Sequence, residues 1–204
     1  MKEHTITVLI TLLALIASAG CAGKVRYPAY YTFNLPSPPD PPAPEGTRAT
    51  LAVREFRSPV YLRQGPIVYR TSPEQIGFYD YHRWAVDPRE FLTSAVIERL
   101  RASGRFAQVR AYDGRSDMEY VLSGRLEKLE EVDYEGGIKV EVAISAQMTN
   151  LASAAIVWTN EVSETGIVEG RDVPAIVSAM NRTMDRAIDK LLATPLVPPA
   201  SNSK

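Results

Sequence analysis

The chain has 204 residues, of which 45% are hydrophobic and 23% are charged, and these are ordinary values for a globular protein. Its formal net charge is −1, so there is no basic excess to neutralise nucleic-acid phosphates or to hold the chain on anionic lipid headgroups. The length suits a single domain with its own hydrophobic core.

The first 20 residues predict a secretory signal peptide. Lys2 gives a basic start, Ile6–Ile16 form an apolar run broken only by two threonines, and small residues lead from Ala17 to Cys21. The tetrad from Ser18 to Cys21 resembles the lipobox of bacterial lipoproteins, although the lipobox usually carries leucine where Ser18 stands. An ordinary cleaved signal and a membrane anchor are the alternatives, but a spanning helix needs about 20 apolar residues.

Acylation of Cys21 would tie the domain to a membrane, because two acyl chains, palmitate among them, give stable anchoring. We therefore expect a signal peptide over 1–20, a lipid-anchored tether over 21–29 and one domain over 30–193. His82 would then be the only histidine and no free thiol would remain. Apart from the covalent lipid on Cys21, no metal site and no cofactor is expected.

The first half of the domain predicts strands from aromatic and β-branched residues. Strands are expected over Tyr30–Leu35, Thr50–Phe56 and Ile67–Arg70, with Gln75–Ala85 as the hairpin partner of the third. Six prolines in Pro36–Pro44 predict a stiff polyproline II connector over residues 36–46, with a ligand for a proline-binding module as the alternative.

A helix is predicted after Asp87, which can cap it, because Pro88 takes the first helical position and Glu90 completes a capping box. Apolar residues recur at helical spacing until Gly104 ends the helix. A short strand is expected over Phe106–Tyr112.

Three strands then form a predicted antiparallel meander. The alternation of Tyr120–Val132 slips at Leu129, which indicates a bulge near Glu127. After a turn at Glu135–Gly137 come the cleanly alternating Ile138–Met148 and, after a second turn, Ile156–Val162.

A last helix is predicted after Asp172, with Pro174 in its first turn and a continuous apolar stripe from Ile176 to Leu191. The tail over 194–204 is expected to be disordered. The order of elements predicts a single α+β domain, with a mainly antiparallel sheet covered by two amphipathic helices.

Two polar features are candidate sites of chemistry. His82 has Asp80 and Asp87 nearby in sequence, but the segment is also typical of a half-exposed strand, and no nucleophile system accompanies it. An acidic run could serve calcium or a hydrolase, but we interpret it as the solvated tip of a hairpin. Its members are Glu130, Glu131, Asp133 and Glu135. No catalytic residue is expected, and the protein is not predicted to be an enzyme.

Aromatic residues gather in the region of the predicted hairpin, and aromatics are enriched both at binding surfaces and in ordinary sheets. Both interpretations stay open for this group, which comprises Tyr61, Tyr69, Phe78, Tyr79, Tyr81 and Trp84.

The order of short motifs resembles the ABC-type transport auxiliary lipoprotein family, also described as paraquat-inducible protein C-like. The resemblance covers essentially the whole chain after Cys21 and is carried by the order and spacing of the motifs. These are Tyr30–Leu35, Ile67–Arg70, Tyr79, Trp84–Ala85 before the capped Pro88 helix, Asp117–Arg125, Val157–Trp158 and the helix around Met180.

The resemblance implies a non-enzymatic lipoprotein that works with an MCE-domain substrate-binding protein, a permease and an ATPase to move lipids between the inner and outer membranes. It implies the periplasmic face of the outer membrane, and Ala22 and Gly23 lack the aspartate that retains lipoproteins at the inner membrane. The motif residues Tyr69, Arg70 and Trp84 are packing or partner contacts, and with Tyr79 and Tyr81 they are the candidate contacts to partner or lipid.

A ring of several copies is compatible with this role. The alternatives are an accessory lipoprotein for secretion or outer-membrane assembly and an envelope hydrolase that depends on His82.

Overall fold

The computed structural model describes residues 26–39, 49–114, 117–134 and 136–194. The signal peptide, Cys21, most of the tether, most of the proline-rich connector and nearly all of the expected tail lie outside the described residues. The described chain begins with β1 (Ala29–Tyr31), β2 (Thr50–Val53), the 3₁₀ helix η2 (Val60–Arg63), β3 (Pro66–Ser72) and β4 (Gln75–Trp84). It continues with α2 (Pro88–Ala102), β5 (Gln108–Ala111), β6 (Tyr120–Val132), β7 (Lys139–Asn150), β8 (Ile156–Ile167) and α3 (Val173–Ala193).

The strands form one eight-stranded sheet organised around β6. Along one edge of β6 run β7 and then β8, both antiparallel, as the meander prediction required. The other edge is shared, because β2 pairs in parallel with the start of β6 and β3 with its end. The α+β prediction is confirmed, and these shorter parallel pairings make the sheet mixed.

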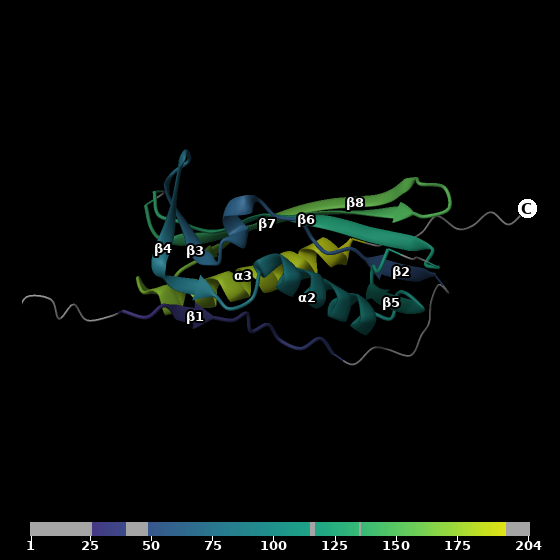
Figure 1. Cartoon of the computed structure of the whole chain (residues 1–204), viewed down its shortest axis with the longest axis horizontal. Coiled ribbons are helices and arrows are strands. Elements are labelled where there is room, and N and C mark those ends of the chain that lie inside the picture. Colours follow the sequence, from purple (N-terminus) through teal and green to yellow (C-terminus); the bar gives the residue numbers. More distant parts are fainter. Residues whose placement is uncertain (1–25, 40–48, 115–116, 135, 195–204) are drawn as a thin grey trace, which may run out of the picture.

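Both helices pack on the same face of the sheet, as Figure 1 shows. α3 lies against β7 and β8, while α2 lies against β5 and β6. The predicted caps are present: the Asp87 side chain accepts from the backbone N–H of Arg89 over 3.0 Å, and that of Asp172 accepts from Ala175 over 2.9 Å. Every residue of the predicted apolar stripe of α3 is buried in the core.

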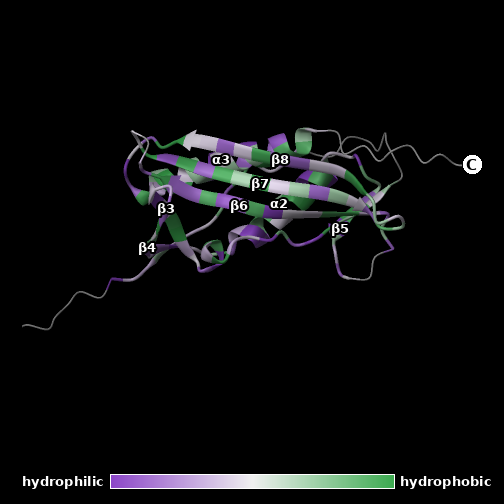
Figure 2. Cartoon of the chain, turned by 90° about the horizontal axis from the view of Figure 1, so that it is seen from above, coloured by the Kyte–Doolittle hydropathy of each residue, from purple (hydrophilic) through white to green (hydrophobic). Residues whose placement is uncertain are grey.

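Alternating hydropathy along the three long strands explains why one face carries the helices (Figure 2). In β7, Val140, Val142 and Ile144 are fully buried, whereas Glu141 and Ser145 on the opposite face are half-buried. The predicted bulge is found between Leu126 and Lys128, where the register of β6 against β7 shifts. The bulge restores the burial of Leu129 after the phase slip.

The chain after β1 departs from the predicted strand. Pairing with β4 ends at Tyr31, and residues 32–39 run in extended form along the outer side of the helices (Figure 1). The ring of Phe33 stacks between Trp84 and Phe91 with centroid distances of 4.3 Å to each. The backbone N–H of Asn34 donates to the side chain of Asn181 on α3 over 2.9 Å. The aromatic pattern of this segment therefore serves helix packing rather than sheet pairing.

β2 is also shorter than predicted and ends at Val53. Phe56 leaves the strand to become a fully buried core residue whose ring covers Gly124, where a Cβ atom would lie 2.2 Å from the ring. The chain rejoins the sheet only at Arg57, through an isolated parallel bridge to Arg125. Along this edge of β6, β2 pairs first, Arg57 follows, and β3 pairs with the end of the strand.

Candidate functional site

The hairpin formed by β3 and β4 joins the rest of the sheet over a short contact, which we call the β3–β6 junction and define by Tyr69, Arg70, Tyr79, Glu130 and Glu131. Only two residue pairs of β3 are in register with β6, Tyr69 with Glu131 and Arg70 with Val132. Side chains on both faces of β6 supplement this short ladder.

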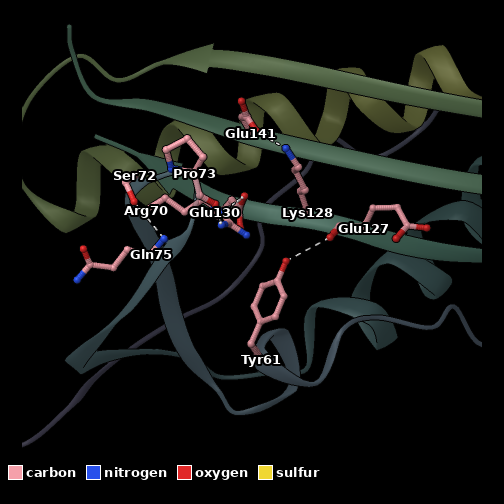
Figure 3. Close-up of polar contacts among 9 residues, drawn as sticks. All are labelled: Tyr61, Arg70, Ser72, Pro73, Gln75, Glu127, Lys128, Glu130 and Glu141. Carbon is pink, nitrogen blue, oxygen red and sulfur yellow. Dashed lines mark hydrogen bonds and ion pairs between the residues drawn. The ribbon is translucent and has the colours of Figure 1, made fainter. Parts of the chain in front are cut away.

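On the face away from the helices, Arg70 pairs with Glu130 (Figure 3). The Nε of Arg70 donates to Oε1 of Glu130 over 2.6 Å, and a second guanidinium nitrogen donates to the carbonyl of Pro73 over 2.8 Å. The Glu130 side chain is fully buried and that of Arg70 is 17% exposed. Burial lowers the pKa of Arg70, but the hydrogen bond and charge of Glu130 outweigh it, so the pKa is raised.

Neighbouring side chains enclose this pair. The hydroxyl of Tyr61, from η2, donates to the backbone carbonyl of Glu127 over 3.4 Å, and Lys128 pairs with Glu141 over 2.9 Å (Figure 3). Burial and the charge of Glu130 raise the pKa of Tyr61. The Lys128 side chain is 47% exposed, so this part of the polar layer is in contact with water while Glu130 beneath it is not.

On the helix-facing side of β6, Glu131 is 3% exposed and accepts a hydrogen bond from the hydroxyl of Tyr79 over 2.7 Å. Burial raises the pKa of Glu131, partly offset by this hydrogen bond. Burial and then Glu131 also raise the pKa of Tyr79. The ring of Tyr69 lies 5.1 Å from that of Tyr79 and covers Gly77, where a Cβ atom would lie 2.2 Å from the Tyr69 ring.

An aromatic series extends from this side toward β1. The ring of His82 meets that of Tyr79 edge to face at 5.8 Å, and the hydroxyl of Tyr31 hydrogen-bonds its Nδ1 over 2.9 Å. Asp87 is engaged in capping α2, and Asp80 is exposed. Among the described residues, no carboxylate hydrogen-bonds His82, so the geometry gives it a structural contact and no catalytic dyad.

The solvated-tip interpretation of the acidic run is wrong for two of its members. Glu130 and Glu131 are buried, because the β3–β4 hairpin returns to the end of β6 and covers both faces. Asp133 is exposed as expected, and Glu135 lies outside the described residues. Both buried glutamates lie between Leu129 and Val132 inside the predicted strand, and this position was the available signal that they are not tip residues.

The described residues hold no group of three or more histidine, cysteine, aspartate or glutamate side chains placed to bind a metal ion. Within the same part of the chain, no helix is long and apolar enough to cross a membrane. The junction holds the Arg70–Glu130 pair on one face of β6 and the Tyr79–Glu131 hydrogen bond on the other, and both join the hairpin to the sheet.

A family model described as the ABC-type transport auxiliary lipoprotein component matches residues 31–191, which is most of the chain. The chain belongs to this family. It is therefore an ABC-type transport auxiliary lipoprotein of the cell envelope. No curated protein matches it.

Solved structures support the fold of the auxiliary lipoprotein. A protein from Xanthomonas campestris is similar with a TM-score of 0.67 and 16% identity, over 80% of this chain and 92% of that one. An uncharacterized protein follows with a TM-score of 0.62 and 14% identity, over 81% and 96% of the two chains. A hypothetical protein from Chlamydia trachomatis has a TM-score of 0.50 and 8% identity, over 72% and 95%.

The candidate contact residues of the auxiliary lipoprotein divide by exposure. Trp84 is 6% exposed and stacks on Phe33, while Arg70 and Tyr79 are engaged with buried glutamates. Tyr81 is 40% exposed, and the guanidinium of Arg26 lies over its ring. Of the remaining aromatic group, Tyr61 and Phe78 are half-buried against the core.

Proposed function

We propose that this auxiliary lipoprotein serves an ABC system of the MCE type that moves lipids between the inner and outer membranes. The family match over residues 31–191 is the observation that carries the proposal. Acylated at Cys21, the protein sits on the periplasmic face of the outer membrane and docks the end of the lipid conduit there. Its partners are an MCE-domain substrate-binding protein and, in the same system, a permease and an ATPase.

One feature of the structure supports a docking role. The exposed ring of Tyr81 lies on β4, which pairs with β1 at the start of the described chain. An anchor at Cys21 therefore places this end of the sheet next to the membrane.

Copurification tests the proposal. The full-length protein with a C-terminal tag is expressed at native level, and the outer membrane is separated and solubilised in detergent. We expect an MCE-domain protein to be retained with the tagged protein, and the Cys21→Ser variant to leave the membrane fraction. Clean isolation without an MCE partner or lipid would contradict the proposal, and recovery with a secretion channel instead would favour the accessory role in secretion.

A further inference from the structure

Three tyrosines are exposed where the described chain begins. Tyr27 is 81%, Tyr30 is 63% and Tyr81 is 40% exposed, although tyrosine has a large apolar ring. The guanidinium of Arg26 lies 4.7 Å from the centre of the Tyr81 ring. We call these four residues the tyrosine patch.

Pairing of β1 with β4 gathers the patch from two distant parts of the sequence. Tyr30 is in register with Arg83, while the next pair, Tyr31 with Trp84, faces the interior. Because successive residues of a strand point to opposite faces, Tyr30 and Arg83 point outward together. The rings of the patch thus lie beside Arg83, whose guanidinium donates to the backbone carbonyl of Gln64 over 2.9 Å, with the exposed Asp80 as a neighbouring acid.

This composition suits a membrane–water interface. Tyrosine has an apolar ring and a polar hydroxyl, and it is enriched at the level of lipid headgroups for that reason. Arginine extends its apolar stem along the rings while its charge stays with phosphates. In bulk water the apolar faces of the same rings stay exposed to solvent.

The short segment between Cys21 and Arg26 limits how far the patch can lie from the membrane. Arg26 follows Cys21 by five residues, and a fully extended chain spans at most about 3.6 Å per residue, so the two α-carbons lie within about 18 Å. With the acyl chains of Cys21 in the bilayer, the patch is held within reach of the headgroups. This step rests on the proposed anchoring at Cys21.

We propose that the tyrosine patch inserts into the headgroup layer of the same membrane that holds the lipid on Cys21. The domain then contacts the bilayer at two points, the acyl chains and the patch, and this fixes its tilt. A lipid anchor alone allows the domain to rotate freely on its tether. A fixed tilt orients the β3–β4 hairpin in the same way on every copy.

Site-directed spin labelling tests the inference on the full lipoprotein in vesicles of phosphatidylethanolamine and phosphatidylglycerol. Cys21 is the only cysteine, so once its sulfur carries lipid, an introduced cysteine is the one reactive thiol. The test variants are Tyr30→Cys and Tyr81→Cys, made singly so that the other tyrosines remain. The matched control is Ile156→Cys: Ile156 is 56% exposed and pairs with Thr149, beside the start of β6 and away from its β3-bearing end.

The measured quantity is the ratio of the collision rate of each label with dissolved oxygen to its collision rate with a water-soluble nickel complex. We expect this ratio to be several-fold higher for labels at 30 and 81 than for the label at 156. The inference would be overturned if the ratios at all three sites were equal and typical of water. This outcome counts when the protein is bound to vesicles and the wild-type protein, which has no added cysteine, takes up no label. So would spin–spin broadening at 30 or 81 that disappears on dilution with unlabelled protein, because it would show a second copy on the patch.

This experiment and the copurification together separate the two proposals. If the wild-type protein takes up label, Cys21 is not acylated, and the anchoring on which the patch depends is wrong. If the labels at 30 and 81 are buried in lipid but no MCE protein copurifies, the membrane contact stands and the proposed transport partner is wrong.

Discussion

The Nε of Arg70 lies 2.6 Å from a carboxylate oxygen of Glu130, in a pair whose acidic member is fully buried. The pair joins the β3–β4 hairpin to the end of β6, where the parallel ladder is only two residue pairs long. The ladder contributes few hydrogen bonds, so the charged pair specifies where the hairpin sits.

Arg70→Met leaves the charge of Glu130 buried without its counter-ion. Breaking a buried pair in this way costs about 3–5 kcal/mol in the free energy of unfolding. The double variant Arg70→Met with Glu130→Leu removes both charges and is expected to recover most of this loss, which chemical denaturation measures. Additive losses in the double variant would show that the two side chains do not act as a pair.

Glu131→Gln tests the effect of burial on the second carboxylate. Burial raises the pKa of Glu131, so the folded protein holds this proton more tightly than the unfolded chain. The free energy of unfolding therefore falls as pH rises from the unfolded pKa, about 4.3, through the raised folded pKa.

Glutamine does not titrate and still accepts from the Tyr79 hydroxyl. We expect the variant to be more stable than the wild type at neutral pH and to lose this advantage below about pH 4. Denaturation curves measured across this pH range check it, and a difference between the two proteins that does not change with pH would contradict the assignment.

Gly77→Ala probes the ring of Tyr69 on the helix-facing side of the hairpin. The added Cβ atom would lie 2.2 Å from the ring, so the Tyr69 ring must shift from its present position. Overpacking of this kind costs about 1–3 kcal/mol. Gly137→Ala is the control, because nothing lies within 4 Å of its Cβ position. Equal thermal midpoints for the two variants would contradict the close contact.

Phe33→Ala releases the segment that connects the tyrosine patch to the helices. Phe33 stacks on Trp84 and Phe91 but is half-buried, so we expect a loss of about 2 kcal/mol, below the range for a fully buried ring. Limited proteolysis should cut the chain between residues 32 and 39 faster in this variant. Phe33→Leu should resist cleavage nearly as well as the wild type, and equal cleavage rates for all three proteins would show that the stack does not hold the segment.

Local signals were sufficient for most elements. Asp87 and Asp172 predicted the starts of both helices, because a short polar side chain before an apolar stripe can accept a hydrogen bond from the free backbone N–H groups of the first turn. A phase slip in the alternation of β6 predicted a bulge near Glu127, and the register shift lies between Leu126 and Lys128, because an inserted residue returns Leu129 to the core. The three-stranded meander followed from alternation and turn residues between neighbours in sequence.

The sequence by itself determined the two capped helices, the meander and its bulge, because these depend on residues a few positions apart. Only the tertiary structure decided that β3 returns in parallel to the end of β6 and that β1 pairs with β4. The paired residues are 53 positions apart for Ala29 and His82 and 62 apart for Tyr69 and Glu131, and such pairings leave no periodicity of their own. For that reason the sequence pattern of Glu130 and Glu131 is that of a solvated tip, although the β3–β4 hairpin buries both side chains. Likewise, Tyr30 and Tyr81 belong to one surface only because β1 pairs with β4.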